Sequence, residues 1–175
     1  MRKYILSMTV LISVMQMAQS SFAQVPCNQP VFRQFDFWIG EWDVYNTNGK
    51  KAGDSEVTLI LDSCVILEEW TSANKYQGVT YAGKSFNKYN TQTKQWQQTW
   101  VDNVGGSTEF LKGNYADSKM VFETNPFPVS KDTVAVRKLT FYNLDPSRVR
   151  QHGEITKDNG KTWVTEYDLE YRRRK

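Results

Sequence analysis

The sequence of 175 residues contains one histidine, His152, and two cysteines, Cys27 and Cys64. A zinc site normally takes three or four ligands from Cys, His, Asp and Glu, and no spacing of these residues matches one. No serine occupies a Gly-x-Ser-x-Gly elbow, and no glycine-rich phosphate loop is present. We therefore expect no metal site, no cofactor and no catalytic triad, and a binding protein rather than an enzyme.

Long stretches with helical periodicity are also missing after the N-terminal region. One short apolar face, formed by Phe32, Phe35 and Ile39, predicts a brief helix within residues 29–37. The rest of the chain consists of short segments in which apolar and polar residues alternate, separated by turn residues. This pattern is typical of antiparallel strands.

About ten such segments follow one another at the spacing of an all-β sandwich or barrel. They are residues 41–45, 56–61, 65–71, 79–89, 94–102, 107–115, 120–123, 134–142, 148–156 and 163–172. Pro126 and Pro128 interrupt the series, and we expect no strand there because proline cannot donate to a sheet ladder. Sequential short hairpins favour an up-and-down meander, whose closure removes exposed edges. The predicted fold class is a single antiparallel up-and-down β-barrel of about ten strands, with the short helix closing one end.

The first residues have the pattern of a secretory signal peptide. Two basic residues precede a largely apolar run over residues 4–17, and Ser21 and Ala23 are small residues placed for a cleavage site. The run is too short for a comfortable membrane span. We expect residues 1–23 to be removed, leaving a domain of residues 24–175 in the periplasm or outside the cell, without a stable membrane anchor. An uncleaved N-terminal anchor is the alternative.

The charge of the expected mature chain is close to neutral. Removing residues 1–23 leaves 175 − 23 = 152 residues and takes away two of the 22 basic residues, so the formal charge becomes 20 − 19 = +1. The basic run at residues 172–175 is explained by a solvated chain end. We expect no nucleic-acid partner, and predict a small-molecule ligand and a monomer or weak homo-oligomer.

Both cysteines lie in the expected mature chain. An exported chain meets an oxidising compartment, so a disulfide between Cys27 and Cys64 is one prediction. It would tie the N-terminal segment to the second or third strand. The alternative is a pair of buried thiols, because cysteine also behaves as a small apolar residue.

Aromatic residues cluster just before the first expected strand. Phe35, Phe37, Trp38 and Trp42 fall within eight consecutive residues that end in Gly-x-Trp. We expect them to plug one end of the barrel and to begin its first strand. The functional residues should therefore lie elsewhere in the interior.

Residues 155–163 contain a Ser/Thr-x-Asp-x-Gly-x-Thr-Trp pattern, the Asp-box of several β-proteins. Asp158 can accept hydrogen bonds from turn amides, Gly160 can adopt positive φ, and Trp163 can pack over the hairpin. A propeller would need several copies, whereas the chain has one. We interpret it as a structural hairpin between the last two strands and not as a sign of a glycosidase.

Large aromatic and polar side chains share strand faces in the second half of the chain. On residues 94–102, two tryptophans, an amide and a carboxylate lie on one face, which suits a pocket for a partly polar organic ligand. The alternative is that the tryptophans fill the core. The predicted ligand-binding residues are Glu68, Trp70, Tyr81, Trp96, Gln98, Trp100, Asp102, Arg137, Gln151 and Tyr167.

Alternation on the last strand predicts a larger inward set. One face carries mainly apolar side chains, and the other, expected to face outward, carries the charges of Glu166, Asp168, Glu170 and Arg172. The residues expected to face inward are Trp163, Thr165, Tyr167, Leu169 and Tyr171.

The Gly40-Glu41-Trp42 start resembles that of lipocalins, in which the Trp packs at the closed end of the barrel beneath an arginine of the last strand. The resemblance implies this role for Arg172 or Arg173. The whole mature chain resembles bacterial exported lipocalin-like domains of unknown function, a group of calycin-type barrels. The matching segments are residues 35–42, 62–64, 68–70, 96–102, 158–163 and 171–173. The resemblance implies a lipocalin-like barrel and supplies no catalytic residue.

We expect an exported barrel that binds a small, partly apolar ligand. One alternative is a hydrolase or isomerase that uses an inward carboxylate, Glu68 or Asp102, as general base. A second is a structural or interaction protein of the cell envelope with a solid barrel. A third is haem binding through His152, although that residue shares its strand face with Arg148 and Arg150 and should be solvated.

Overall fold

The computed structural model describes residues 27–175, apart from the side chain of Tyr76. The signal peptide predicted for residues 1–23 lies outside this range. The strands are β1 (Gly40–Asn46), β2 (Lys51–Ile60), β3 (Val65–Tyr76), β4 (Val79–Asn90), β5 (Gln95–Asp102), β6 (Ser107–Ala116), β7 (Lys119–Thr124), β8 (Phe127–Ser130), β9 (Thr133–Asp145), β10 (Arg148–Thr156) and β11 (Val164–Arg173).

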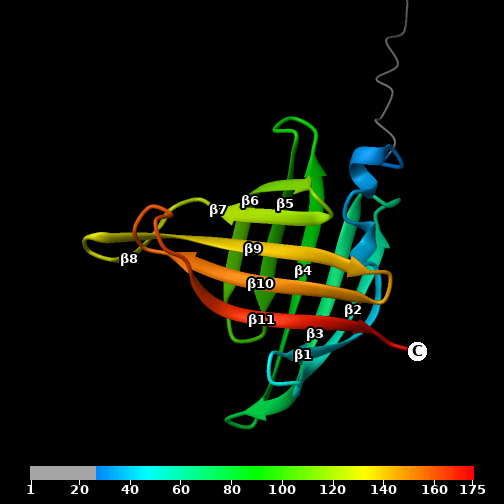
Figure 1. Ribbon diagram of the computed structural model, residues 1–175, viewed down its shortest axis with the longest axis horizontal. Helices are drawn as coiled ribbons and strands as arrows, with labels where there is room; N and C mark the ends of the chain where they lie inside the picture. The colour runs from blue at the N-terminus through cyan, green and yellow to red at the C-terminus, as the bar shows by residue number, and fades with distance from the viewer. Residues whose placement is uncertain (1–26) are drawn as a thin grey trace, which may run out of the picture.

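Ten of these strands form a closed antiparallel barrel, which confirms the predicted fold class. The order is β1 through β7, then β9, β10 and β11, and the ring closes where β11 pairs with β1. Apart from the step around β8, every strand pairs with its neighbour in sequence (Figure 1). Such a meander follows from short turns, because a turn of a few residues places the next strand alongside.

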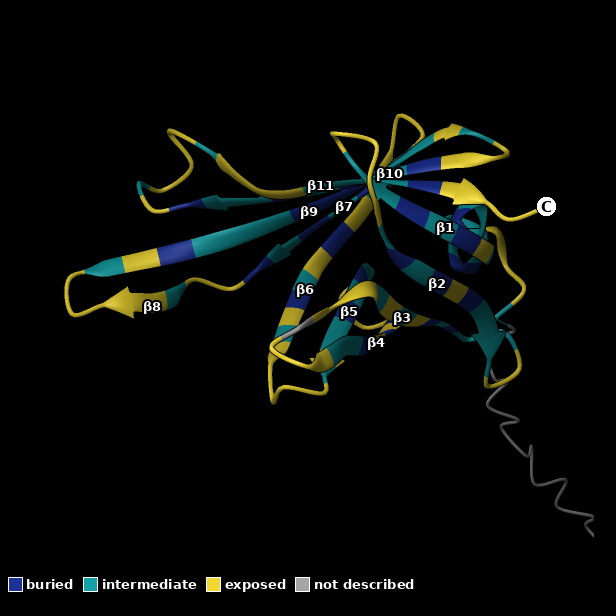
Figure 2. Ribbon diagram, turned by 90° about the horizontal axis from the view of Figure 1, so that it is seen from below, coloured by how far each residue is buried: buried dark blue, intermediate teal, exposed yellow. Residues whose placement is uncertain are grey.

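The absence of a strand around the two prolines was a wrong expectation. Residues Phe127–Ser130 form β8, which pairs only with the first part of β9. Pro128 is tolerated because β8 is an edge strand and one side of it needs no amide donor. The β8–β9 hairpin therefore extends away from the barrel as an arm (Figure 2).

Two short helical turns, η1 (Pro30–Arg33) and η2 (Asp36–Trp38), occupy the place of the predicted helix. They bury Phe32, Phe35 and Trp38, so Trp38 takes the position expected for Ile39. The Phe35 and Trp38 rings stack at 5.0 Å and contact Phe141 of β9. This aromatic cluster fills one end of the barrel, as the sequence predicts.

Trp42 is fully buried at the same end, and its indole N–H donates to the Trp38 carbonyl at 2.9 Å. The Arg173 guanidinium carbon lies 4.3 Å from the centre of the Trp42 ring. Gly40 leaves room for that guanidinium, because any Cβ at this position would overlap it and the φ of +143° disfavours other residues. Arg173, rather than Arg172, therefore covers the tryptophan.

A disulfide bond joins Cys27 to Cys64, whose Cα atoms are 5.0 Å apart. It ties the segment before η1 to the turn between β2 and β3. Arg33 reinforces this tie by donating a hydrogen bond to the Ser63 carbonyl. Within residues 27–175 no helix is long and apolar enough to cross a membrane.

Candidate functional site

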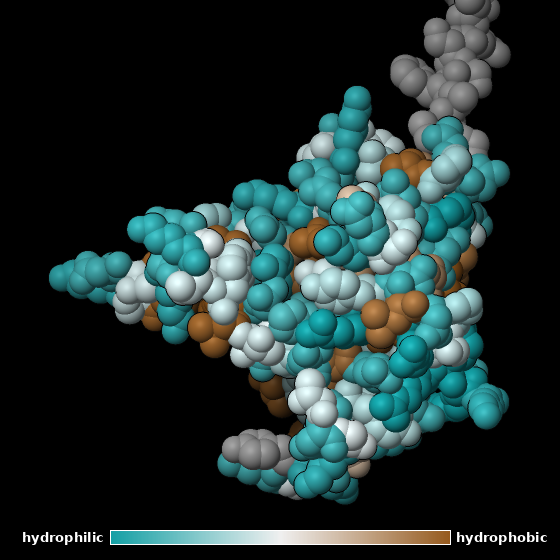
Figure 3. Space-filling model, viewed as in Figure 1, coloured by the Kyte–Doolittle hydropathy of each residue, from teal (hydrophilic) through white to brown (hydrophobic). Residues whose placement is uncertain are grey.

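The end of the barrel opposite the aromatic plug contains a cavity of about 510 Å³. Strands β3, β4, β5, β6, β9, β10 and β11 contribute to its wall. In the space-filling view the surface is hollowed between the β8–β9 arm and the β3–β4 hairpin, with hydrophobic side chains inside the hollow (Figure 3). The lining residues are Glu68, Trp70, Tyr81, Gln98, Trp100, Asp102, Gly106, Ser107, Thr108, Phe110, Arg137, Gln151, Glu166, Tyr167, Leu169 and Tyr171.

Nine of the ten predicted ligand residues line this cavity, and Trp96 does not. Trp96 is 2% exposed, and its indole N–H donates to Gln34 Oε1 at 3.1 Å. Its ring also meets the edge of Phe35. Trp96 does face inward, but it lies at the start of β5 beside the plug, so it packs in the core. Trp100 lies four residues, or about 13 Å, further along the extended strand. It therefore reaches the cavity.

Several lining residues were not predicted as ligand contacts. Leu169 and Tyr171 lie on the inward face that alternation identified, so the signal was present. Phe110 and Thr108 come from β6, on which no ligand residue was predicted. Glu166 was expected to face outward.

A β-bulge explains the error at Glu166. Gly153 pairs with Tyr167, whereas the next residue, Glu154, pairs with Thr165, so β11 has an extra residue at this point. A bulge reverses the alternation beyond it. Glu166 therefore lines the cavity mouth. Thr165 is exposed and lies 3.0 Å from His152, so it does not face inward as expected.

Trp163 is a related correction. It was expected to face inward, but its ring packs under the Lys138 ammonium at 4.0 Å. Lys138 is paired in turn with Glu154 on the outer face of the sheet. The predicted hairpin contacts are nevertheless present, because Asp158 accepts from the amide and the hydroxyl of Thr162. The Asp-box pattern thus holds a turn.

Glu68 forms the floor of the cavity and is 2% exposed. Its Oε1 accepts hydrogen bonds from Ser55 and Tyr171, and its Oε2 accepts one from Ser85, each at 3.0 Å. Burial raises the pKa of Glu68 from 4.5 to about 7, and the three hydroxyls limit the rise. Its neighbour Glu69 faces outward and pairs with Lys84.

The floor continues as a hydrogen-bonded chain across the sheet. Ser85 accepts from the amide of Asn87 at 2.9 Å, and Asn87 accepts from the amide of Gln98 at 2.7 Å. All three side chains are buried, as is Glu68. Burying polar side chains costs little free energy of folding only when they are hydrogen-bonded, and the side chains of this network are.

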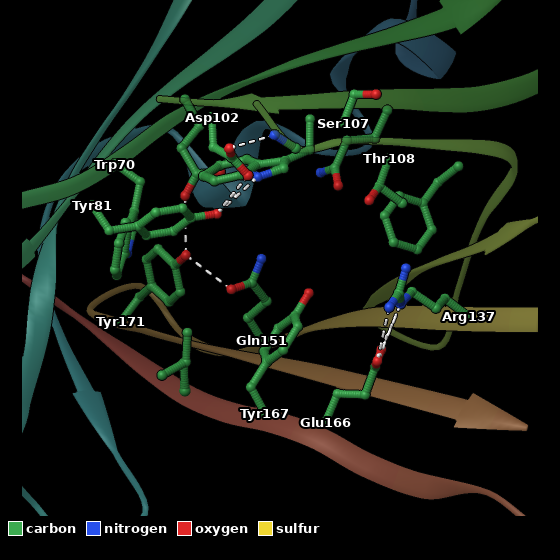
Figure 4. Close-up of a pocket in the computed structure, with 16 residues that line it drawn as sticks. Trp70, Tyr81, Asp102, Ser107, Thr108, Arg137, Gln151, Glu166, Tyr167 and Tyr171 are labelled. Atoms are coloured by element: carbon green, nitrogen blue, oxygen red, sulfur yellow. Dashed lines mark hydrogen bonds and ion pairs between the residues drawn. The ribbon is translucent and has the colours of Figure 1, made fainter. Parts of the chain in front are cut away.

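Tyr171 connects Glu68 to Gln151. Its hydroxyl lies 3.0 Å from Glu68 Oε1 and 3.0 Å from Gln151 Oε1, but it has one proton to donate (Figure 4). When Glu68 is ionised, Tyr171 donates to it and a rotated Gln151 amide donates to the phenol. When Glu68 is protonated, its carboxyl O–H donates a hydrogen bond to the Tyr171 oxygen, and the Tyr171 hydroxyl donates to Gln151 Oε1. The floor therefore accommodates both protonation states of Glu68.

Three glycines allow aromatic rings to lie flat against the wall. A Cβ at Gly83 would overlap the Trp100 ring, a Cβ at Gly53 would stand 2.8 Å from Trp70, and a Cβ at Gly153 would stand 2.5 Å from Tyr167. Each glycine lies on a strand next to its aromatic partner. The rings spread over backbone instead of projecting inward, which leaves the interior open.

Tyr81 links two of these rings to a carboxylate. Its ring centre is 5.7 Å from that of Trp70 and 6.4 Å from that of Trp100. The Trp100 indole N–H donates to the Tyr81 oxygen at 3.2 Å, and the Tyr81 hydroxyl donates to Asp102 Oδ2 at 3.0 Å.

Asp102 also orders the turn between β5 and β6. Its Oδ1 accepts from the amides of Gly106 at 2.7 Å and Val104 at 3.1 Å. Burial by itself would raise the pKa of Asp102, but hydrogen bonds from Gly106, Tyr81 and Val104 outweigh it and lower the pKa. Asp102 is therefore an ionised carboxylate in the cavity wall at neutral pH.

Arg137 and Glu166 form a bidentate ion pair on the side of the cavity opposite Asp102 (Figure 4). Arg137 Nε lies 2.9 Å from one Glu166 oxygen, and Nη2 lies 3.1 Å from the other. The guanidinium also lies 5.1 Å from the Phe127 ring centre. The positive charge of Arg137 is thus balanced by its own partner.

His152 lies outside the cavity, on the outer face of β10. Its Nε2 is 3.0 Å from the Thr165 hydroxyl and its Nδ1 is 3.6 Å from Glu154. The structure therefore does not place it where a haem inside the barrel would need an axial ligand. Among residues 27–175, no group of three or more His, Cys, Asp or Glu side chains could hold a metal ion.

No model of a known protein family matches the chain, and no curated protein matches it in sequence. The closed barrel is compatible with a lipocalin-like fold.

Proposed function

We propose that the protein binds a small, partly apolar molecule inside its barrel. The observation that carries this proposal is the 510 Å³ cavity, whose aromatic walls lie flat over glycines. Its size is in the range of small-molecule sites, which are mostly apolar with a few placed polar groups. A solid envelope protein would have filled this space with side chains.

Two further features support a lipocalin-like carrier that works after export. Arg173 covers Trp42 at the closed end of the barrel, the arrangement implied by the lipocalin resemblance. The disulfide between Cys27 and Cys64 is of a kind that persists in an oxidising compartment. We therefore propose that the protein acts in the periplasm or outside the cell.

The test uses the neutral fluorescent probe N-phenyl-1-naphthylamine. Thr108 lines the cavity, whereas the next residue, Glu109, is exposed on the outer face of β6. Thr108→Trp should obstruct the cavity and weaken probe binding at least about tenfold, a loss of roughly 1.4 kcal/mol. Glu109→Trp adds the same ring outside and should leave binding unchanged.

Thermal unfolding of both variants shows whether each is folded at the assay temperature. The wild type should bind one N-phenyl-1-naphthylamine molecule per chain, and the fluorescence emission of the bound probe should shift to shorter wavelength. Binding that resists Thr108→Trp but responds to Glu109→Trp would place the probe on the outer surface and would contradict the proposal.

A second candidate, acid–base catalysis, is favoured by one observation. Glu68 lines the cavity and has a pKa of about 7, a suitable value for a general base. Three wall hydroxyls already bond to this carboxylate, which favours the binding function. Deuterium exchange into 2-tetralone in heavy water is a direct assay: catalysis requires faster exchange with wild type than with Glu68→Gln, and equal rates exclude it for such ketones.

A further inference from the structure

The cavity has an unequal balance of charge. Its ionisable carboxylates are Glu68, Asp102 and Glu166, and its single basic side chain is Arg137. Arg137 is bound by Glu166 through both nitrogens of a bidentate pair, so these two charges cancel locally. The charge left without an opposite partner in the cavity wall is therefore negative, on Asp102 and, when it is ionised, on Glu68.

The hydrogen bonds to Asp102 come from neutral donors. Two backbone amides and the Tyr81 hydroxyl bond to its oxygens, and no cation of the described residues forms an ion pair with it. These bonds keep the carboxylate ionised without cancelling its charge. A negative group that is partly screened from water attracts a cation more strongly than a solvated one does.

The aromatic walls favour the same sign of charge. Tyr81 lies between Trp70 and Trp100, and all three line the cavity next to Asp102. The face of an aromatic ring has negative potential and attracts a cation that lies within about 6 Å of the ring centre. A flat apolar body can lie on these rings while its charged group reaches the carboxylate.

Tyr167 adds a neutral polar contact. Its hydroxyl points into the cavity and has no hydrogen-bond partner among the described residues (Figure 4). Burial raises the pKa of this phenol, so it stays uncharged at neutral pH. The phenol oxygen can accept a hydrogen bond from an ammonium group, and it brings no positive charge that would favour an anion.

We propose that the cavity selects organic cations, namely protonated amines attached to a flat apolar body, and discriminates against organic anions. This proposal rests on the proposed binding function and gives its ligand a chemical class. It follows from the sign of the unbalanced charge and from the ring faces beside it.

Three probes of nearly equal shape test the proposal: 1-naphthylmethylamine, 1-naphthalenemethanol and 1-naphthoate. They carry a positive charge, no charge and a negative charge at pH 7.5. Calorimetric titration of the full mature chain should show the amine binding about tenfold more tightly than the alcohol, and the carboxylate binding more weakly than both. Asp102→Asn should reduce the preference for the amine, whereas the matched outer variant Glu109→Gln should retain it.

Each outcome separates the two proposals. Equal affinity for the three probes, or tightest binding of 1-naphthoate, would overturn the selection of cations while leaving a binding cavity. Failure of all three to bind would contradict both the cation selection and the binding function. If Asp102→Asn unfolds the turn, Tyr81→Phe tests the same carboxylate: it removes one neutral donor from Asp102, so the preference for the amine over the alcohol should increase, and an unchanged preference would count against Asp102 as the partner of the cation.

Discussion

Gly83 on β4 lies directly beneath the indole ring of Trp100 on β5, so close that a Cβ atom at residue 83 would overlap the ring. The registered partner of Trp100 is Ser85, and the indole therefore extends diagonally to cover the glycine. The open cavity depends on this contact, because a larger residue would lift the ring from the wall.

Gly83→Ala should displace Trp100 into the cavity. We expect a loss of about 1–3 kcal/mol in the free energy of unfolding, typical of overpacking, and weaker binding of N-phenyl-1-naphthylamine. Urea unfolding and probe titration measure the two effects. Ala82→Val, which adds bulk on the outward side of the same strand, serves as control. Unchanged stability and affinity in Gly83→Ala would show that the ring does not need the glycine.

Glu68 should make stability depend on pH. Its folded-state pKa of about 7 exceeds the ordinary 4.5, so the folded chain holds the proton more tightly than the unfolded chain. The stabilisation is complete below pH 4.5 and is lost as the pH rises through 7. A shift of this size corresponds to about 3 kcal/mol.

Urea unfolding at pH 5 and pH 8 tests this dependence. The wild type should be less stable at pH 8, and Glu68→Gln should lose most of the difference, whereas the exposed Glu69→Gln should keep it. The depressed pKa values of Asp145 and Asp158, about 2, act only below about pH 4, outside this window. The same fall in stability in Glu68→Gln would assign it to other groups.

The closed end should support folding and not binding. Trp42→Ala removes a fully buried ring and should cost about 3–5 kcal/mol. Arg173→Ala removes the ring contact and the hydrogen bonds to the carbonyls of Ile39 and Pro146, and should cost about 1–2 kcal/mol. Arg172→Ala also loses a ring contact, with Tyr45 at 4.3 Å, but no hydrogen bond to the backbone, and should cost less. If Trp42→Ala abolished probe binding at unchanged stability, the assignment of Trp42 to the plug would be wrong.

The disulfide should stabilise the fold by closing a long loop. Cys27 and Cys64 are 37 residues apart, and the chain-entropy model assigns a loop of this length about 3–4 kcal/mol. Replacing both by serine should lower the free energy of unfolding by up to that amount, with little change in probe affinity. Thiol titration of the unfolded, unreduced protein should detect no free thiol. Two titratable thiols would contradict the bond.

Glu166→Gln should weaken the discrimination against anions, because it leaves the Arg137 charge without its carboxylate. The affinity for 1-naphthoate should rise several-fold, and that for 1-naphthylmethylamine should fall. Asp168→Asn breaks a similar bidentate pair, with Arg150, on the outer face and is the matched control. Equal effects of the two variants would indicate a general change in charge and not a contact in the cavity.

The sequence by itself determined the fold class and most of the cavity wall. Alternation along each segment separates inward from outward side chains, since successive residues of a strand point to opposite faces. That rule was enough to select Glu68 over Glu69, to place Gln151 and Trp100 inside, and to leave His152 outside. It needs only local information, because the period of a strand is the same wherever the strand lies.

Only the tertiary structure decided how far along the barrel axis each residue lies, which partner each charge has, and the sign of the net charge in the cavity wall. Trp96 and Trp100 share a face, yet the tilt and stagger of the closed barrel place one against the plug and the other in the cavity. The bulge that brings Glu166 to Arg137 lies in the pairing of β10 with β11, and the alternation within either strand alone does not reveal it. Alternation shows whether a side chain points inward or outward, but it does not give the position of the residue along the barrel axis. That position follows from how the strands are tilted and staggered when the barrel closes.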